Sequence, residues 1–331
     1  TGTTPCGATT TAPSRSGDRR VDASEPRRTR ATSRADAPVP VDAMTRRHES
    51  PTEHAVPGRF AGQTVIVTGS TRGIGAGVAE RFAAEGANVV VSGRTASAGE
   101  AVADRISEAN RVADEQRDGD APRTGDASFV QADMRDPDDV AALVEAAAER
   151  YGSVDVLVNN AGVQTETTAE EATLDDWSFV LETDFRAYWL AARAALEHMD
   201  RGAIVNVSSN HAYATMPAHF PYNAVKAGIN GMTRSLAVDF GPQVRVNTVV
   251  PGWVEVERTR DELPEGRLEA VESIHPTGRI GTVADVAGAV SFLASEDAAF
   301  VTGSALLVDG GRGAVMQDDT LPDYRARERS E

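Results

Sequence analysis

Apolar and polar residues follow two alternating patterns between residues 63 and 310 of the chain. Short runs of apolar, mostly β-branched residues, which are typical of strands, are separated by longer segments in which apolar positions recur with the helical period. The predicted strands are TVIVT at 64–68, NVVVS at 88–92, SFVQA at 128–132, VDVLV at 154–158, AIVNV at 203–207, VRVNTVV at 244–250 and ALLVD at 305–309. One helix is predicted to follow the first strand and to extend through Ala84. Further helices are predicted over Pro137–Tyr151, Leu174–Met199, Pro221–Asp239 and Val283–Leu293.

The predicted strands are apolar on both faces. Such strands belong in a parallel sheet that helices cover on each side. We therefore predict an α/β fold, in which a single Rossmann-type doubly wound domain holds a seven-stranded parallel sheet with helices on both faces. The polar, acidic stretch from Ala109 to Gly125 is interpreted as a solvated surface loop.

The two ends of the chain have a different composition. Residues 1–57 are rich in Thr, Ala, Pro, Arg and Ser and have no aromatic residue, so they are predicted to be a disordered low-complexity segment. Met44 is a candidate start within this segment. The folded domain is predicted over residues 58–313, and a polar C-terminal tail over 314–331.

The acidic charge of the chain belongs to the predicted domain. The net charge is −17, but residues 1–57 hold nine Arg against seven Asp or Glu, so the remainder carries −19. Such a surface argues against nucleic acid as a partner. Dense carboxylates also keep a protein hydrated in molar salt, which predicts a halophilic source; an acidic enzyme without salt adaptation is the alternative.

Several classes of protein and of site are not expected. No apolar run approaches the length of a membrane span and no secretory signal is recognisable, so we expect a soluble, cytoplasmic protein with no membrane partner. Cys6 is the only cysteine, which excludes an internal disulfide. The six histidines show no metal-ligand spacing, so no metal is predicted.

The first predicted strand leads into the glycine-rich sequence TGSTRGIG at 68–75, and a helix follows. Gly69 allows a tight turn there, Gly73 lets the backbone approach a pyrophosphate, and Gly75 permits close packing of the helix. Glycines also occur in such turns for conformational reasons alone. The pattern predicts a dinucleotide site that includes Gly69, Thr71, Arg72, Gly73, Ile74 and Gly75.

Charge next to this turn predicts which nicotinamide cofactor is bound. An enzyme that uses NAD places an acidic residue near the end of the second strand, where it would repel a 2′-phosphate. Here the position is Gly93, followed by Arg94, and Arg72 lies within the glycine turn. Two guanidinium groups favour NADP. If both are only solvated surface charges, NAD is also accepted.

Lysine is almost absent from the chain, since 32 of the 33 basic residues are Arg and only Lys226 is Lys. Lys226 follows Tyr222 by four positions on a predicted helix, so the two side chains point the same way. A tyrosine phenol is a weak base at neutral pH, but a neighbouring ammonium and an oxidised nicotinamide both stabilise the phenolate. The pair predicts proton transfer; a surviving surface lysine is the alternative.

The spacing GxxxGxG, NNAG at 159–162 after the fourth strand, and YNAVK at 222–226 together resemble the short-chain dehydrogenase/reductase family over residues 59–312. The resemblance implies that Ser209, 13 residues before Tyr222, holds the substrate oxygen while Tyr222 transfers a proton and Lys226 binds the nicotinamide ribose. It further implies cofactor contacts at Asp133, Met134, Asn159, Asn160, Ala161, Gly162, Tyr222, Lys226, Pro251, Gly252 and Val254.

Two positions depart from the pattern of this family. Asp184 aligns with its fourth catalytic residue, usually Asn, and Val256 stands where a Thr that contacts the carboxamide is common. If that Asn acts through its backbone carbonyl, Asp serves equally well. If the Asp184 charge pairs with Lys226, the ammonium helps the phenol less, and we predict a shifted pH optimum.

The substrate is less well defined by the sequence. Loop 210–220 and Trp253 are expected to cover it, with Ser209 and His211 as substrate contacts. His211, Pro217 and Phe220 resemble the loop of glucose 1-dehydrogenases, whereas the general pattern is also similar to 3-oxoacyl-[acyl-carrier-protein] reductases. The prediction is an enzyme that interconverts a carbonyl and an alcohol of a sugar, polyol or 3-oxoacyl thioester; a non-catalytic NADP-binding regulatory protein is the alternative. A homotetramer or homodimer is expected.

Overall fold

The computed structural model describes residues 50–116, 124–257, 259 and 267–315. All of them belong to one compact unit, Asp42–Glu331. The predictions made for residues 1–49 and for the tail from 316 onward lie outside the described residues.

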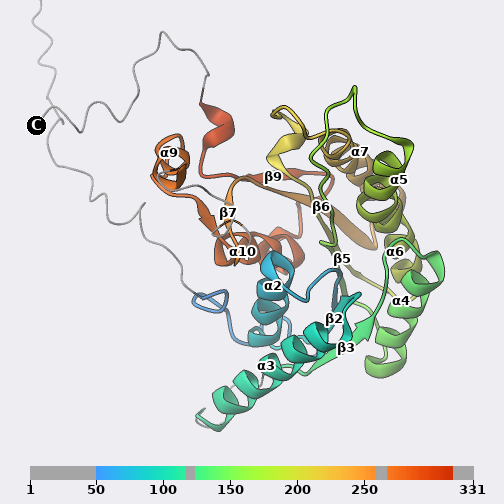
Figure 1. Cartoon of the computed structure of the whole chain (residues 1–331). Coiled ribbons are helices and arrows are strands. Elements are labelled where there is room, and N and C mark those ends of the chain that lie inside the picture. Colours follow the sequence, from blue (N-terminus) through green and yellow to red (C-terminus); the bar gives the residue numbers. More distant parts are fainter. Residues whose placement is uncertain (1–49, 117–123, 258, 260–266, 316–331) are drawn as a thin grey trace, which may run out of the picture. The chain divides into compact units, whose positions relative to one another are not determined.

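Seven parallel strands form the central sheet, as the apolar runs predicted (Figure 1). Their order is β3-β2-β1-β4-β5-β6-β9. The strands are β1 (Thr64–Val67), β2 (Asn88–Gly93), β3 (Ala127–Gln131), β4 (Val156–Asn159), β5 (Gly202–Val207), β6 (Val244–Pro251) and β9 (Ala305–Val308). The order reverses between β1 and β4, and the loops that follow such a pair of strands form the ligand crevice of doubly wound sheets.

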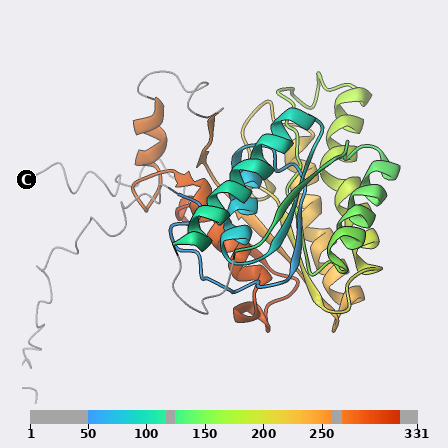
Figure 2. The ribbon, with the colours of Figure 1, turned by 90° about the horizontal axis from the view of Figure 1, so that it is seen from below.

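Helices cover both faces of the sheet (Figure 2). They are α2 (Gly73–Ala84), α3 (Ala96–Glu115), α4 (Pro137–Tyr151), α5 (Leu174–Leu181), α6 (Ala187–Leu196), α7 (Tyr222–Phe240), α9 (Arg267–Ser273) and α10 (Val283–Ala294). Alternate residues of one strand serve the two faces, because side chains point to opposite sides of a sheet. Val65 and Val67 pack with Phe82 of α2, whereas Ile66 packs with Leu143 of α4.

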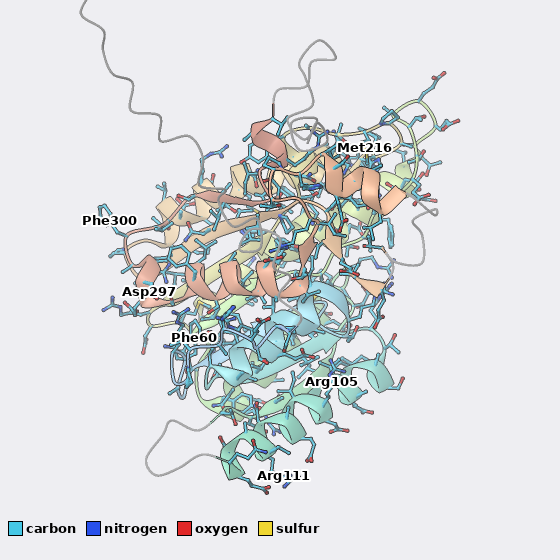
Figure 3. The ribbon with its side chains drawn as sticks, turned by 90° about the vertical axis from the view of Figure 1, so that its left-hand side faces the viewer. Phe60, Arg105, Arg111, Met216, Asp297 and Phe300 are labelled. Carbon is cyan, nitrogen blue, oxygen red and sulfur yellow. The ribbon has the colours of Figure 1, made fainter. Side chains whose placement is uncertain are left out.

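The surface loop predicted over 109–125 is wrong for its first part, because α3 continues to Glu115. Arg111 forms ion pairs with Glu108 and Glu115, one turn away on either side, and Asn110 Nδ2 donates to the Gly125 carbonyl at 2.8 Å. These local contacts stabilise a polar helix that has little apolar periodicity at its end. Arg105 and Arg111 lie along this helix in Figure 3. Residues 117–123 lie outside the described part.

The long helix predicted over 174–199 is interrupted. A π-helical turn, Glu182–Arg186, joins α5 to α6, and α6 ends at Leu196. A π-turn inserts one residue into the helical ladder and changes which side chains face the sheet. This π-turn contains Asp184 and positions its side chain.

The ordered part of the chain begins before residue 58. Residues 50–57, assigned above to the disordered segment, form turns and lie against α2. Arg81 Nε donates to the fully buried Glu85 carboxylate at 2.8 Å, and the guanidinium also donates to the carbonyls of Pro51 and His54. Polar contacts of this kind leave no apolar pattern in the sequence. For that reason the composition of residues 1–57 did not predict that residues 50–57 pack on the domain.

A second, two-stranded sheet pairs β7 (Val254–Glu255) with β8 (Gly281–Thr282). Neither strand was predicted, because two residues are too few for a pattern. Among the described helices, none combines the length and hydropathy of a membrane span.

Candidate active site

The glycine turn packs directly against the loop after β4. Gly69 and Gly73 adopt φ values of +62° and +56°, which favour glycine. A Cβ at Gly69 would lie 2.6 Å from Ala161 Cα, and one at Gly75 would overlap the Asn160 side chain. The first and third glycines are therefore required by packing between two loops that are far apart in sequence.

Asn160 holds this turn in place. Its Nδ2 donates to the carbonyls of Thr68 and Gly69, both at 3.0 Å, and Thr68 Oγ1 accepts the backbone N–H groups of Asn160 and Ala161. Asn159, by contrast, points into the domain and donates to Asn206 Oδ1 at 2.9 Å. Of the two, Asn160 shapes the predicted cofactor site and Asn159 ties β4 to β5.

The N-terminus of α2 carries no side-chain cap, unlike those of α4, α5 and α10. Its first N–H groups and the helix dipole suit a pyrophosphate. A cleft of about 650 Å³ opens beside it, lined among others by Thr71, Arg72 and Gly73. The chain's own groups thus fit a dinucleotide phosphate here.

Neither Arg72 nor Arg94 forms an ion pair within the described ranges, whereas Arg105, at the same cleft as Arg72, pairs with Glu80 at 2.6 Å. Gly93 packs closely, since a Cβ there would lie 2.5 Å from Thr71 Cγ2. The end of β2 therefore carries a glycine in place of an acidic residue, followed by the guanidinium of Arg94.

Asp133 is engaged by a neighbour. Its carboxylate accepts hydrogen bonds from the Arg135 guanidinium at 2.6 and 3.1 Å, which lower the pKa of Asp133, with a small contribution from the charge of Arg94. Met134 is buried next to it. The predicted adenine contact at Asp133 would have to be made beside this ion pair.

Ser209, Tyr222 and Lys226 converge at the end of β5. Ser209 follows that strand after Ser208, whose hydroxyl donates to the Lys226 carbonyl at 2.8 Å. Tyr222 is the first residue of α7 and Lys226 lies one turn later, with its Nζ 5.5 Å from the centre of the Tyr222 ring. The order and spacing predicted from the sequence bring these three residues to one place.

The π-turn brings Asp184 to the same place. Asp184 Oδ2 lies 3.0 Å from Lys226 Nζ, and both side chains are buried, with 0% and 5% exposed. Asp184 Oδ1 accepts the Val163 N–H at 2.8 Å, and Lys226 Nζ donates to the Val207 carbonyl at 3.2 Å. The sequence left open whether residue 184 acts through its backbone carbonyl or whether its charge pairs with Lys226. In the structure, the Asp184 carboxylate pairs with Lys226.

Burial and charge compete in this pair. Burial raises the pKa of Asp184 above its ordinary value, against the attraction of Lys226 and the hydrogen bond from Val163. Burial also opposes the charge on Lys226, but the attraction of Asp184 and the nearby tyrosines outweighs it, and the pKa of Lys226 lies above its ordinary value. The lysine is therefore an ammonium at neutral pH.

Gly162 links the cofactor loop to this ion pair. A Cβ at Gly162 would lie 2.9 Å from Asp184 Oδ2 and 3.4 Å from Lys226 Nζ. The last glycine of NNAG is thus the residue against which the pair packs. This contact depends on the π-turn and was not predicted from the sequence.

The remaining predicted residues surround the site. Pro251 ends β6, Gly252 packs on Asp309, and Val254 lies in β7, while Trp253 is half-buried between them. Val256 lies 3.6 Å from the position of a Cβ at Gly73. His211 lies edge-on to the Tyr222 ring at 5.7 Å. His219, which sequence reasoning missed, stacks on His211 at 4.4 Å.

Within the ranges that the structure describes, no three His, Cys, Asp or Glu side chains gather closely enough to hold an ion.

The chain is similar to known oxidoreductases. A family model described as enoyl-(acyl carrier protein) reductase matches residues 69–312. The 3beta-hydroxysteroid dehydrogenase 1 of Eggerthella lenta is 37% identical over 258 residues, 76% of this chain and 93% of the relative. Glucose 1-dehydrogenase 2 of Bacillus subtilis is 36% identical over 259 residues, 76% of this chain and 95% of the relative.

A solved structure shows the same fold. A mutant of the short-chain dehydrogenase/reductase from Serratia marcescens superposes with a TM-score of 0.69 at 32% identity, over 77% of this chain and 99% of that one. The chain therefore belongs to the short-chain dehydrogenase/reductase family and is an oxidoreductase that acts on CH–OH groups.

Proposed function

We propose that the protein is an NADP-preferring dehydrogenase that interconverts a secondary alcohol and a carbonyl through Ser209, Tyr222 and Lys226. The observation that carries this proposal is the buried ammonium of Lys226, one turn from Tyr222 and fixed by Asp184 and the Val207 carbonyl. A buried lysine held this firmly is unusual unless its charge is used.

The chemistry divides between the cofactor and the chain. The nicotinamide, when bound, accepts or supplies the hydride. The Ser209 hydroxyl holds the substrate oxygen and the Tyr222 phenol moves the proton at that oxygen. Lys226 has three N–H donors, of which one goes to the Val207 carbonyl, while Asp184 Oδ2 is an ion-pair partner 3.0 Å from Nζ. A further N–H is left for the ribose of the cofactor.

The preference for NADP rests on Arg72 and Arg94, which lack carboxylate partners in the described part of the chain, and on Gly93. Arg94→Asp would place a negative charge where a 2′-phosphate is expected. We expect the ratio of kcat/KM for NADP⁺ to that for NAD⁺ to fall at least about tenfold, the size of one charge-assisted bond. An unchanged ratio would remove this assignment.

Two of the relatives suggest a class of substrate. The substrates in their names, a 3beta-hydroxysteroid and glucose, both carry the reacting oxygen on a six-membered ring. We propose a cyclic secondary alcohol or hemiacetal for this chain, in preference to an open-chain 3-oxoacyl thioester. The net charge of −19 over residues 58–331 supports that choice, because it would repel an acidic carrier protein.

The test is a panel of cyclic alcohols, sugars and 3-oxoacyl thioesters, followed at the NADPH absorbance band. Tyr222→Phe serves as the matched variant, since it removes one oxygen from the same ring. We expect Tyr222→Phe to lose at least about 100-fold in kcat, as for other removed acid–base groups, while cofactor binding persists. Tight NADP⁺ binding by the wild type without turnover of any substrate would favour the non-catalytic alternative.

We also propose a homo-oligomer. Large apolar side chains are exposed on α5, α6 and α7: Leu174, Trp177, Trp189 and Val238. Light scattering after size-exclusion chromatography tests this, and a monomer at micromolar concentration would contradict it.

A further inference from the structure

The loop after β5 places two imidazole rings beside the residues assigned to the substrate oxygen. The rings of His211 and His219 stack with centroids 4.4 Å apart and an interplanar angle of 16°. The His211 ring meets the Tyr222 ring edge-on at 5.7 Å, and the backbone N–H of His211 donates to Ser209 Oγ at 3.2 Å. The stack therefore adjoins both Ser209 and Tyr222.

A hydrogen bond within the loop fixes the tautomer of His219 when this ring is neutral. His219 Nδ1 lies 2.8 Å from the Pro217 carbonyl, which can only accept, so Nδ1 carries the hydrogen and Nε2 is the unprotonated acceptor. Thr215 Oγ1 lies 2.9 Å from His211 Nδ1 and 3.4 Å from the Met216 carbonyl, so its one hydrogen can go to either and both tautomers of His211 fit the loop.

Across the described ranges, no hydrogen bond reaches Nε2 of His211 or of His219. Burial and the nearby His219 lower the pKa of His211 to about 4, so this ring is neutral at neutral pH. The loop expected to cover the substrate thus carries two Nε2 atoms that make no hydrogen bond to the described residues, beside the residues assigned to the substrate oxygen.

We propose that the His211–His219 stack determines specificity by accepting a hydrogen bond from a hydroxyl group adjacent to the one that reacts. This inference rests on the proposed function and narrows its substrate to a ring alcohol with neighbouring hydroxyl groups, a polyol or a cyclic sugar. An apolar ring alcohol would cover the Nε2 atoms of the stack and leave them unsatisfied, which disfavours it.

The experiment compares two substrates that differ by one hydroxyl, trans-1,2-cyclohexanediol and cyclohexanol, with NADP⁺. We expect wild-type kcat/KM to be higher for the diol. His219→Phe keeps an aromatic ring for stacking but removes both nitrogens, so the diol-to-cyclohexanol ratio of kcat/KM should fall about three- to tenfold, the loss of one hydrogen bond. His219→Gln, whose amide oxygen can reach the place of Nε2, should restore most of the ratio.

Matched controls separate this role from a structural one. His198→Phe makes the same change at a surface residue that pairs with Glu145 at 3.2 Å, and should leave the ratio within about twofold. His219→Leu repeats the test if the Phe variant does not fold, as judged by circular dichroism. A folded variant with the wild-type ratio would overturn the specificity proposal alone. A wild type that oxidises neither of these alcohols nor any substrate of the panel above would overturn the proposed function and this inference with it.

Discussion

Asp184 and Lys226 meet where water is almost excluded, so each is the main partner of the other's charge. Removing one member of a buried ion pair costs far more than the pair contributes, because the remaining charge stays desolvated. The pair also places a negative charge within the group of residues proposed to move a proton. A change at Asp184 is therefore expected to affect both stability and catalysis.

Asp184→Asn should lower the free energy of unfolding by about 3 kcal/mol at pH 7. The pKa of Lys226 is raised in the folded protein, so its stabilising contribution is complete below the ordinary lysine pKa and is lost as pH rises above it. The difference between wild type and variant should therefore persist from pH 7 to 9 and shrink above about pH 10.5. Urea denaturation at several pH values measures this, and equal stabilities at pH 7 would contradict it.

The same variant should change the pH dependence of alcohol oxidation. Without the carboxylate, the positive charge of Lys226 acts on Tyr222 unopposed, so the rising limb of the kcat profile should move to lower pH. A profile that superposes on that of the wild type would show that the Asp184 side chain is not coupled to proton transfer.

Residue spacing predicted some of these neighbours and not others. Tyr222 and Lys226 are one helical turn apart, so any helix there brings them together, and the expected Ser209 lies at the end of β5. The contact of Gly162 with the ion pair and the stacking of His219 depend on a π-turn and an irregular loop. Neither the π-turn nor the irregular loop produces a periodic pattern in the sequence.

At the scale of elements, strands were predicted well because parallel strands buried on both faces must be apolar throughout. The end of α3, the π-turn and the pair β7–β8 were not, since side-chain ion pairs and tertiary packing decide them. Side-chain contacts also decide the position of residues 50–57, the segment before β1, which was not predicted. Its attachment depends on Glu85, which accepts from Arg81, from the Val56 N–H at 2.9 Å and from the Ser291 hydroxyl at 2.5 Å.

Glu85→Gln should loosen this segment from α2 and α10. The change leaves the buried Arg81 guanidinium without its counter-charge, and we expect a loss of about 3 kcal/mol in unfolding free energy with faster proteolysis near residues 50–60. Glu80→Gln is the matched control on the same helix, because its pair with Arg105 is partly exposed and should contribute less than about 1 kcal/mol. Similar losses in both variants would contradict this role of Glu85.

For the whole molecule, the dominant quantity is the acidic charge, −17 for the full chain. Salt shortens the range of repulsion between carboxylates, from ~10 Å at 0.1 M to ~3 Å at 1 M. We expect the Tm to rise by at least about 5 °C, roughly 1–3 kcal/mol for a domain of this size, between low and molar potassium chloride. A Tm that is flat or falls would favour an acidic enzyme without salt adaptation.

The solitary lysine also determines how the protein reacts with acylating reagents. Lys226 is the only side-chain amine in the chain and is 5% exposed, with its ammonium bound to Asp184. An N-hydroxysuccinimide ester should therefore attach one label to the native protein, at the α-amino group, and a second only after denaturation. Intact mass spectrometry would count the labels, and this selectivity would give a surface-tethered preparation a single point of attachment.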